Sequence, residues 1–152
     1  MIAYYELTKQ LYDYLQSDED VNTVLIGNID EIDTNKVTMF PLAHILVGAV
    51  TPYNGFLRFS VTISTMDVID IKKNDPTKGD WKGNDNKQNL LNTMLAVQEN
   101  LVRYIQKGAM YDAGYSIEGL PSITPFEDRF ENLLTGWSST ITIDVPNNVQ
   151  KC

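Results

Sequence analysis

The sequence is poor in the residues that build reactive and metal-binding sites. Its one cysteine, Cys152, is the last residue, and its one histidine is His44. A single cysteine cannot form an intrachain disulfide, so we expect a reducing compartment. A zinc site needs three or four nitrogen or sulfur ligands, which these two residues cannot supply. The composition therefore predicts no metal site and no redox motif.

Long apolar runs and nucleotide-binding motifs are also missing. The longest apolar stretch, 40–50, is interrupted by Pro41, His44 and Gly48, and it is shorter than the roughly 18 residues of a membrane-spanning helix. Neither GxxxxGK[ST] nor GxGxxG occurs, so no nucleotide cradle is predicted. The first ten residues lack a basic stretch followed by an apolar core, so we expect no secretory signal. We expect a protein without a membrane partner or cofactor.

The sequence offers little support for catalysis. His44 stands between Ala43 and Ile45 in a run that looks buried, and this setting favours a structural histidine over a member of a Ser-His-Asp triad. Acidic residues cluster at 18–20, 30–33 and 127–131, as solvated surfaces commonly do, and we expect no active site of paired carboxylates. We predict that the chain is not an enzyme.

What the sequence has in excess is negative charge. It contains 20 acidic and 12 basic residues, a formal net charge of −8, and its isoelectric point is about 4.5. Neutralisation of phosphates supplies most non-specific affinity for nucleic acids, so we expect no general DNA or RNA binder. The length of 152 residues with 43% hydrophobic content predicts one domain with one core.

Hydrophobic periodicity predicts two helices and a long hairpin. Apolar residues recur at helical spacing over 3–16 and from about Gln88 to Gly108, with Asp85 and Gln88 resembling a capping box. The expected strands are a short one at 24–26, the hairpin strands around a turn at 51–55, a short one at 115–118, and a last one at 137–145. The first hairpin strand is 40–50, and the second alternates over 57–64 within a strand-like run that ends at Asp70. We predict an α+β fold in which both helices pack on one face of an antiparallel sheet of three or four strands.

Polar side chains alternate with the apolar ones along the hairpin and should form the other face of this sheet. They are Arg58, Ser60, Thr62 and Ser64, joined by Thr140 and Thr142 of the last strand. Such a face is suited to lining a channel or a subunit contact.

Residues 72–87 form a basic arm in an acidic protein. This segment, KKNDPTKGDWKGNDNK, has five lysines and three aspartates, about +2 in net charge, whereas the rest of the chain has seven basic and seventeen acidic residues. A structureless loop of this length is usually disordered or functional. We expect it to bind an acidic protein surface, with Trp81 as its anchor, because tryptophan is enriched among interface hot spots. Its charged contacts should come from Lys72, Lys73, Lys78 and Lys82.

The pattern as a whole resembles the tail-terminator, or tail-completion, ring proteins of tailed bacteriophages and their relatives in the neck. The elements that carry this resemblance are the N-terminal helix, the hairpin LAHILVGAVTPYNGFLRFSVTISTMDV, the polar arm, the helix NLLNTMLAVQENLVRYIQKG and the closing strand GWSSTITIDVP. They cover most of the chain. The Tyr- and Asn-rich composition, with KNDPTKGDWKGNDNK, is similar to that of crAss-like phages, which infect Bacteroidetes.

The resemblance implies a single domain over residues 1–152 that assembles into a closed ring of identical subunits, six-fold on long-tailed phages or twelve-fold in a short-tailed neck. The ring would be assembled in the host bacterial cytoplasm and lie in the virion between the portal or head-completion proteins and the tail. Genomic DNA would pass through its lumen without specific binding. The arm would reach an adjacent ring or subunit, although relatives often have a shorter arm there.

Two alternatives stay open. The first is an adaptor that forms no ring and binds an acidic partner through the arm. The second is a small hydrolase or metal-dependent enzyme that uses His44.

Overall fold

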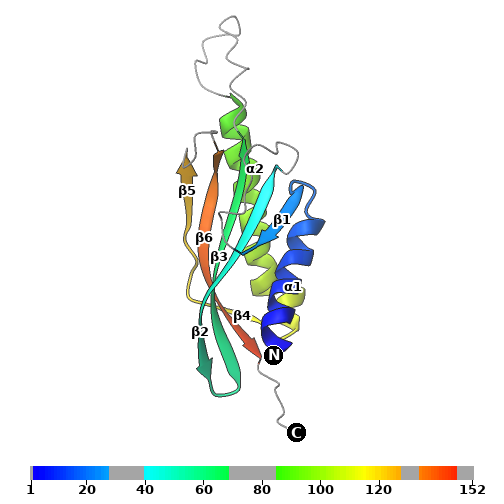
Figure 1. The fold of residues 1–152 in the computed structure, drawn as a ribbon, viewed down its shortest axis with the longest axis vertical. Coiled ribbons are helices and arrows are strands. Elements are labelled where there is room, and N and C mark those ends of the chain that lie inside the picture. Colours follow the sequence, from blue (N-terminus) through cyan, green and yellow to red (C-terminus); the bar gives the residue numbers. More distant parts are fainter. Residues whose placement is uncertain (1, 28–39, 69–84, 128–133, 147–152) are drawn as a thin grey trace, which may run out of the picture.

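A computed structural model describes residues 2–27, 40–68, 85–127 and 134–146. Figure 1 shows a long, narrow molecule in which the strands run roughly parallel to two helices. In chain order the elements are α1 (Ile2–Ser17), β1 (Thr23–Ile26), β2 (Leu42–Tyr53), β3 (Phe56–Val68), α2 (Asp85–Lys107), the short helix α3 (Ala109–Asp112), β4 (Ser116–Glu118), β5 (Ile123–Glu127) and β6 (Leu134–Pro146).

The six strands that the structure describes form one sheet in the order β1-β2-β3-β6-β4, and β5 also pairs with β6. The α+β class is confirmed, but the predicted count of three or four strands is too low. The prediction of a wholly antiparallel sheet is also wrong, because β1 lies parallel to β2. Strand β5 was not predicted because Pro125 is typical of a turn or connector. Proline is tolerated there because β6 is the one described strand with which β5 pairs.

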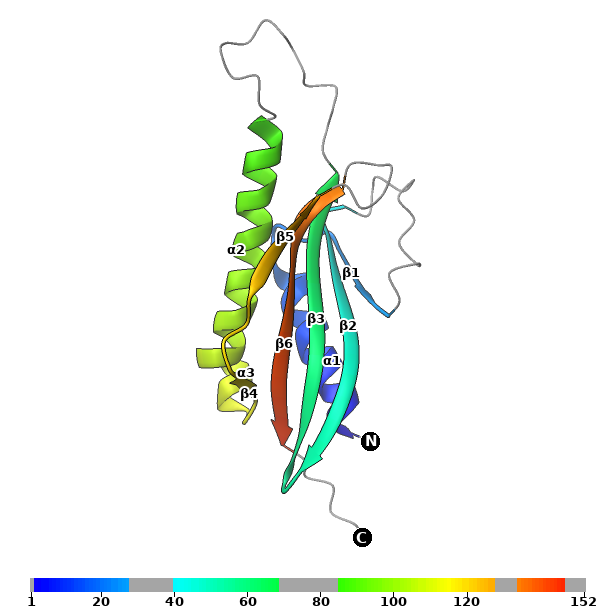
Figure 2. The ribbon, with the colours of Figure 1, turned by 90° about the vertical axis from the view of Figure 1, so that its left-hand side faces the viewer.

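The hairpin of β2 and β3 is the longest feature of the sheet, and its tip projects beyond the helices in Figures 1 and 2. Its turn is Asn54 and Gly55 alone, shorter than the predicted 51–55, because β2 continues to Tyr53. Gly55 has a φ of +82°, a conformation that glycine adopts without strain, and Asn-Gly is the preferred pair for such tight hairpins. A register shift between Val47 and Val50 interrupts the pairing with β3.

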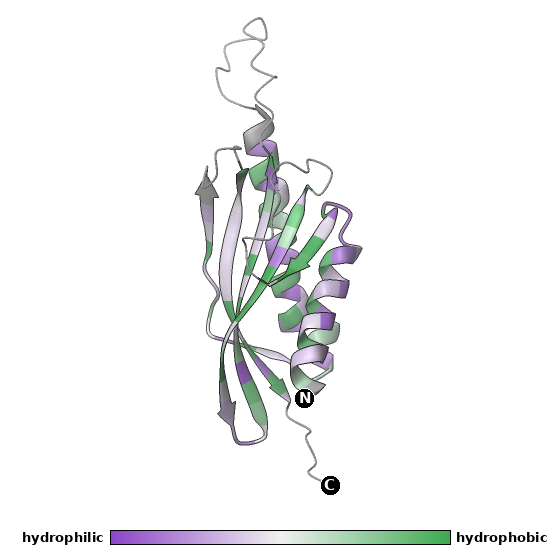
Figure 3. Ribbon diagram, viewed as in Figure 1, coloured by the Kyte–Doolittle hydropathy of each residue, from purple (hydrophilic) through white to green (hydrophobic). Residues whose placement is uncertain are grey.

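The main hydrophobic core lies on the sheet face that carries Phe59, Ile63 and Ile141, all buried. Buried leucines of α1 and buried residues of α2, including Leu101, belong to the same cluster. Figure 3 shows the resulting alternation of hydrophobic and hydrophilic residues along both helices. Burying one such aliphatic side chain stabilises a fold by about 1.5 to 3 kcal/mol, so this shared cluster joins both helices to the sheet.

The opposite sheet face, called the outer face below, is polar over only part of its length. A second hydrophobic cluster of Phe40, Leu42, Met66 and Leu134 is buried there, at the end of the sheet away from the hairpin tip. The run around His44, which looks buried in the sequence, is buried only in its first half. In the structure burial ends at Ile45, where β1 ends, and most of the following residues of β2 are exposed.

Helix α2 is tied to the sheet by a buried polar side chain, Gln98, which has no measurable exposure. Its Nε2 donates to the carbonyl oxygens of Ile63 in β3 (2.9 Å) and Trp137 in β6 (3.2 Å), and its Oε1 accepts from the Ser139 hydroxyl (2.8 Å). Thr65 adds a hydrogen bond to the carbonyl oxygen of Met94 at 3.1 Å. These bonds fix the register between α2 and the two longest strands.

The predicted ends of α2 need two corrections. The helix begins at Asp85 rather than near Gln88, so the last three residues of the predicted arm are helical. It ends at Lys107 before Gly108, as predicted, but Gly108 has a φ of −97° and not the left-handed conformation of a typical C′ glycine. Glycine is needed there because a Cβ atom would lie 2.7 Å from the carbonyl oxygen of Tyr104.

Candidate interaction surfaces

The outer face near the middle of the hairpin carries a ladder of hydroxyl groups. Thr62 in β3 and Thr140 in β6 are directly paired, and their hydroxyls lie 3.2 Å apart. The next pair, Ser64 and Ser138, has the same separation. Ser60 pairs with Thr142 in the same way across the two strands. The structure therefore places the predicted residues side by side on one face, although Ser64 is buried.

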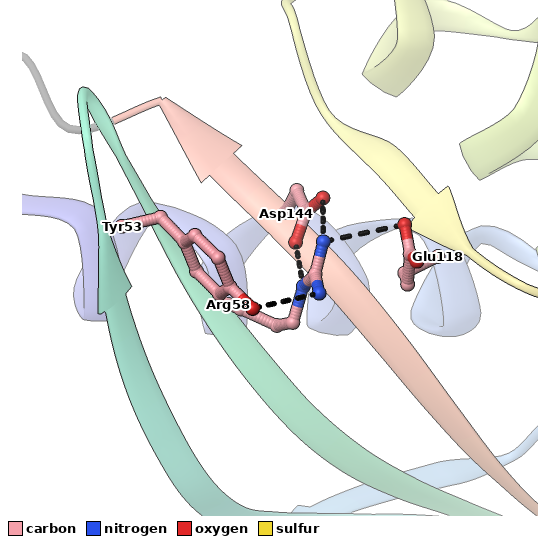
Figure 4. Close-up of polar contacts among 4 residues, drawn as sticks. All are labelled: Tyr53, Arg58, Glu118 and Asp144. Carbon is pink, nitrogen blue, oxygen red and sulfur yellow. Dashed lines mark hydrogen bonds and ion pairs between the residues drawn. The ribbon is translucent and has the colours of Figure 1, made fainter.

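Arg58, the one basic residue of the predicted polar face, is neutralised by neighbouring carboxylates (Figure 4). Its Nε and Nη2 donate to the two oxygens of Asp144 at 2.7 and 3.0 Å, and Nη2 lies 3.2 Å from a carboxylate oxygen of Glu118. The hydrogen bond to Asp144 raises the pKa of Arg58 above its ordinary value. Among the described residues, this face consequently presents hydroxyl groups and an arginine paired with carboxylates, but no free guanidinium.

Aromatic rings cover the same arginine at the hairpin tip. The guanidinium carbon of Arg58 lies 4.6 Å from the ring centre of Tyr53, which stacks on Phe56 with ring centres 5.0 Å apart and planes at 7°. Cation–π contacts of this kind stabilise by about 0.5 to 1 kcal/mol at exposed sites. Together with the Asp144 bonds they join β2, β3 and β6, and so stiffen the hairpin tip.

The sheet has two open edges toward the hairpin end. Strand β1 pairs with only the first four residues of β2. No other described strand pairs with residues 46–53 along the edge of β2 that faces away from β3. Three large apolar side chains in this segment are well exposed, Leu46 (39%), Val50 (44%) and Tyr53 (49%). On the far side of the sheet, β4 pairs with β6 alone among the strands that the structure describes.

These edges were not predicted from the sequence. The exposed half of β2 follows directly on a buried half of similar composition, and periodicity cannot show where a neighbouring strand stops. Pro52 is the one available signal, because proline within a strand favours an edge position. Leu120 likewise lies in the link between β4 and β5 with 92% exposure, at a position that sequence reasoning treated only as connector.

The predicted partner-binding residues of the arm lie outside the described residues. They are Lys72, Lys73, Lys78, Trp81 and Lys82. The side chain of Asp85, half of the predicted capping box, is also outside them. The described residues on either side of 69–84 are Val68, the end of β3, and Asp85, the start of α2.

His44 occupies a structural position. Its side chain is 2% exposed, and Nε2 is hydrogen-bonded to the carbonyl oxygen of Gly27. A carbonyl oxygen only accepts, so Nε2 carries the proton and donates. This bond ties the end of β1 to β2. Among the described residues, no group of three or more His, Cys, Asp or Glu side chains is arranged to hold a metal ion.

Comparisons with known proteins add no family to this description. The chain matches no protein-family model, and no curated protein matches it. Within the described segments, no helix combines the length and the apolar character that crossing a membrane requires.

Proposed function

We propose that this protein is a structural subunit that joins head to tail with identical copies to form a closed ring, and that the ring belongs to the neck or tail of a tailed phage. The observation that supports the ring most strongly is the pair of open edges on opposite sides of one sheet. One edge is the segment 46–53 of β2, and the other is β4. The phage setting is supported by the sequence resemblance.

The β2 edge has the properties of a strand-pairing surface. Unpaired backbone N–H and C=O groups along an edge are a template for another strand, and monomeric proteins protect such edges with lysine or other charges. Residues 46–53, LVGAVTPY, contain no charged side chain. Pro52 has no N–H group, so a strand added here would pair chiefly with 46–51. Added strands of this kind bind through main-chain hydrogen bonds and gain specificity from alternate side chains.

Two different edges on one subunit favour a ring over a dimer. An isologous dimer would pair one edge with itself and leave the other open. Joining β2 of one copy to the β4 side of the next is a heterologous contact, which closes into a ring when the rotation per subunit divides a full turn. Six-fold and twelve-fold closure both meet this condition.

The outer face is suited to the lumen of such a ring. Its hydroxyl groups are neutral, and Arg58 is held by Asp144 and Glu118. Binding of DNA phosphates depends on basic side chains that replace counterions. A face whose described residues offer no free cation lets DNA slide past without being held. In this proposal the neighbouring portal, head-completion or tail proteins contact the two rims of the ring.

The ring is tested by the variant Val50→Lys, which places a charge on the β2 edge. We expect the dissociation constant for assembly to rise by about thirtyfold, equivalent to about 2 kcal/mol for loss of an interface anchor. Sedimentation velocity over a concentration series measures it. The matched control is Tyr5→Lys on α1, which replaces an even more exposed residue (66%) away from both edges and should assemble as the wild type does.

Assembly that is equally unaffected by both variants would refute pairing through this edge. The adaptor alternative predicts a monomer that binds an acidic partner, and deletion of 72–87 would then abolish binding. Cryo-electron microscopy of the virion tests the neck or tail position, where density for this chain elsewhere in the particle would contradict the proposal.

A further inference from the structure

An open cavity of about 360 Å³ lies between the end of α1, the end of β3 and the first turns of α2. Its apolar lining comes from Val21, Pro41, Leu90 and Met94. Three carboxylate side chains, Glu19, Asp20 and Asp67, also line it, together with Asn22, Asn89 and Thr93. None of the described lining residues is basic. The cavity is therefore apolar inside and negatively charged around it.

We propose that this cavity binds the basic arm, 72–87, of a second copy of the chain, with Trp81 on the apolar lining and Lys78 and Lys82 beside the carboxylates. The choice of a second copy rests on the proposed ring. The inference deepens that function, because it names the surface that receives the arm.

Size and charge both fit this occupant. Ligand pockets range upward from about 300 Å³, so the cavity of about 360 Å³ is large enough to receive an indole ring. Trp81 is the only large apolar side chain of the arm and has lysines three residues before it and one residue after it. Burial raises the pKa of Asp67, which marks a carboxylate that is partly removed from solvent. A lysine from the arm would supply that charge.

The length of the arm favours a neighbour over its own chain. Most connections in compact domains have about 4 to 6 residues, so 69–84 far exceeds what joining β3 to α2 requires. Half of this segment, when extended, spans about 26 Å, which is enough to reach an adjacent domain of this size. Binding of the arm to its own cavity is a separate outcome that the following experiment identifies.

A charge exchange between two variants tests the proposal. In one, Glu19→Lys and Asp20→Lys make the cavity basic; in the other, Lys78→Glu and Lys82→Glu make the arm acidic. Glu19 and Asp20 are exposed, so the cavity variant does not disturb the core. Each variant alone should assemble at least about tenfold more weakly than the wild type, because like charges then meet. In an equal mixture, every basic arm can meet an acidic cavity and every acidic arm a basic one, and assembly should recover to within about threefold.

The outcomes separate the possible occupants. If each variant is weakened and the mixture is not restored, the arm binds its own cavity and the proposal is overturned. If both variants assemble as the wild type does, the arm binds elsewhere, and the ring stands without this contact. If the wild type itself stays monomeric, the proposed function fails. The control variant Glu99→Lys with Asp112→Lys makes the same charge change at exposed residues outside the cavity and should leave assembly unchanged.

Discussion

Replacing Gln98 by methionine should strongly destabilise the fold, because one side chain holds α2 against both long strands. Methionine has nearly the same length but neither donates nor accepts as an amide does. The change removes two donated hydrogen bonds and one accepted bond, all at a position with no measurable exposure. At about 1 kcal/mol net for each bond, the free energy of unfolding should fall by about 3 kcal/mol.

Urea denaturation followed by circular dichroism measures this change. For a chain of this length, about 3 kcal/mol corresponds to a decrease of about 6 to 12 °C in Tm. The control is Gln106→Met on the same helix, where the side chain is only partly buried and the effect should stay within about 0.5 kcal/mol.

A double-mutant cycle with Ser139→Ala identifies the mechanism. Gln98→Met leaves the Ser139 hydroxyl without its acceptor, and Ser139→Ala removes that hydroxyl. The losses in free energy of unfolding should therefore be less than additive by about 1 kcal/mol. A loss below about 1 kcal/mol for Gln98→Met, or full additivity in the cycle, would refute the account of α2 as hydrogen-bonded to both strands.

Three further tests concern the Asp67 carboxyl, the pairing of Arg58 and the role of His44. Burial raises the pKa of Asp67 above its unfolded value, so the stability that the protonated carboxyl contributes is lost as the pH rises through that folded pKa. The variant Asp67→Asn should therefore be more stable than the wild type at neutral pH, but not below the ordinary carboxyl range. Equal pH profiles of the two proteins in urea titrations would contradict this. The double variant Asp144→Asn and Glu118→Gln removes the negative charges that hold Arg58. In filter binding of duplex DNA, the slope of the logarithm of affinity against the logarithm of salt concentration should then be steeper by about 0.9 per freed cation. An unchanged slope would contradict the description of the outer face as lacking a free cation. His44→Gln keeps a hydrogen-bond donor and should be about 1 kcal/mol more stable than His44→Leu, whereas equal denaturation midpoints would argue against the structural role.

Much of the fold followed from periodicity. The two long helices, the hairpin and the last strand were predicted because each has an apolar stripe that recurs at the spacing of its own secondary structure, whereas the short helix α3 lies in a segment predicted as a connector. The direction of β1 was not predictable, since a four-residue strand has the same pattern in parallel and antiparallel pairing. Strand β5 was missed because Pro125 suggested a connector.

The surfaces were less predictable than the core. The alternation in β3 located the polar face that contains Thr62, but not the neutralisation of Arg58, which depends on Asp144 and Glu118 from strands far away in the sequence. Gln98 falls at helical spacing between Met94 and Leu101, so periodicity places it on the buried face of α2. Its partners become visible only once β3 and β6 lie side by side.

Native mass spectrometry of the purified full chain tests the head-to-tail ring most directly. A head-to-tail ring should appear as a single closed oligomer, six-fold or twelve-fold, whose population rises with concentration. This oligomer should be largely lost for Val50→Lys but not for Tyr5→Lys. A monomer at every concentration, a dimer that grows no further, or an open-ended series of sizes would contradict it.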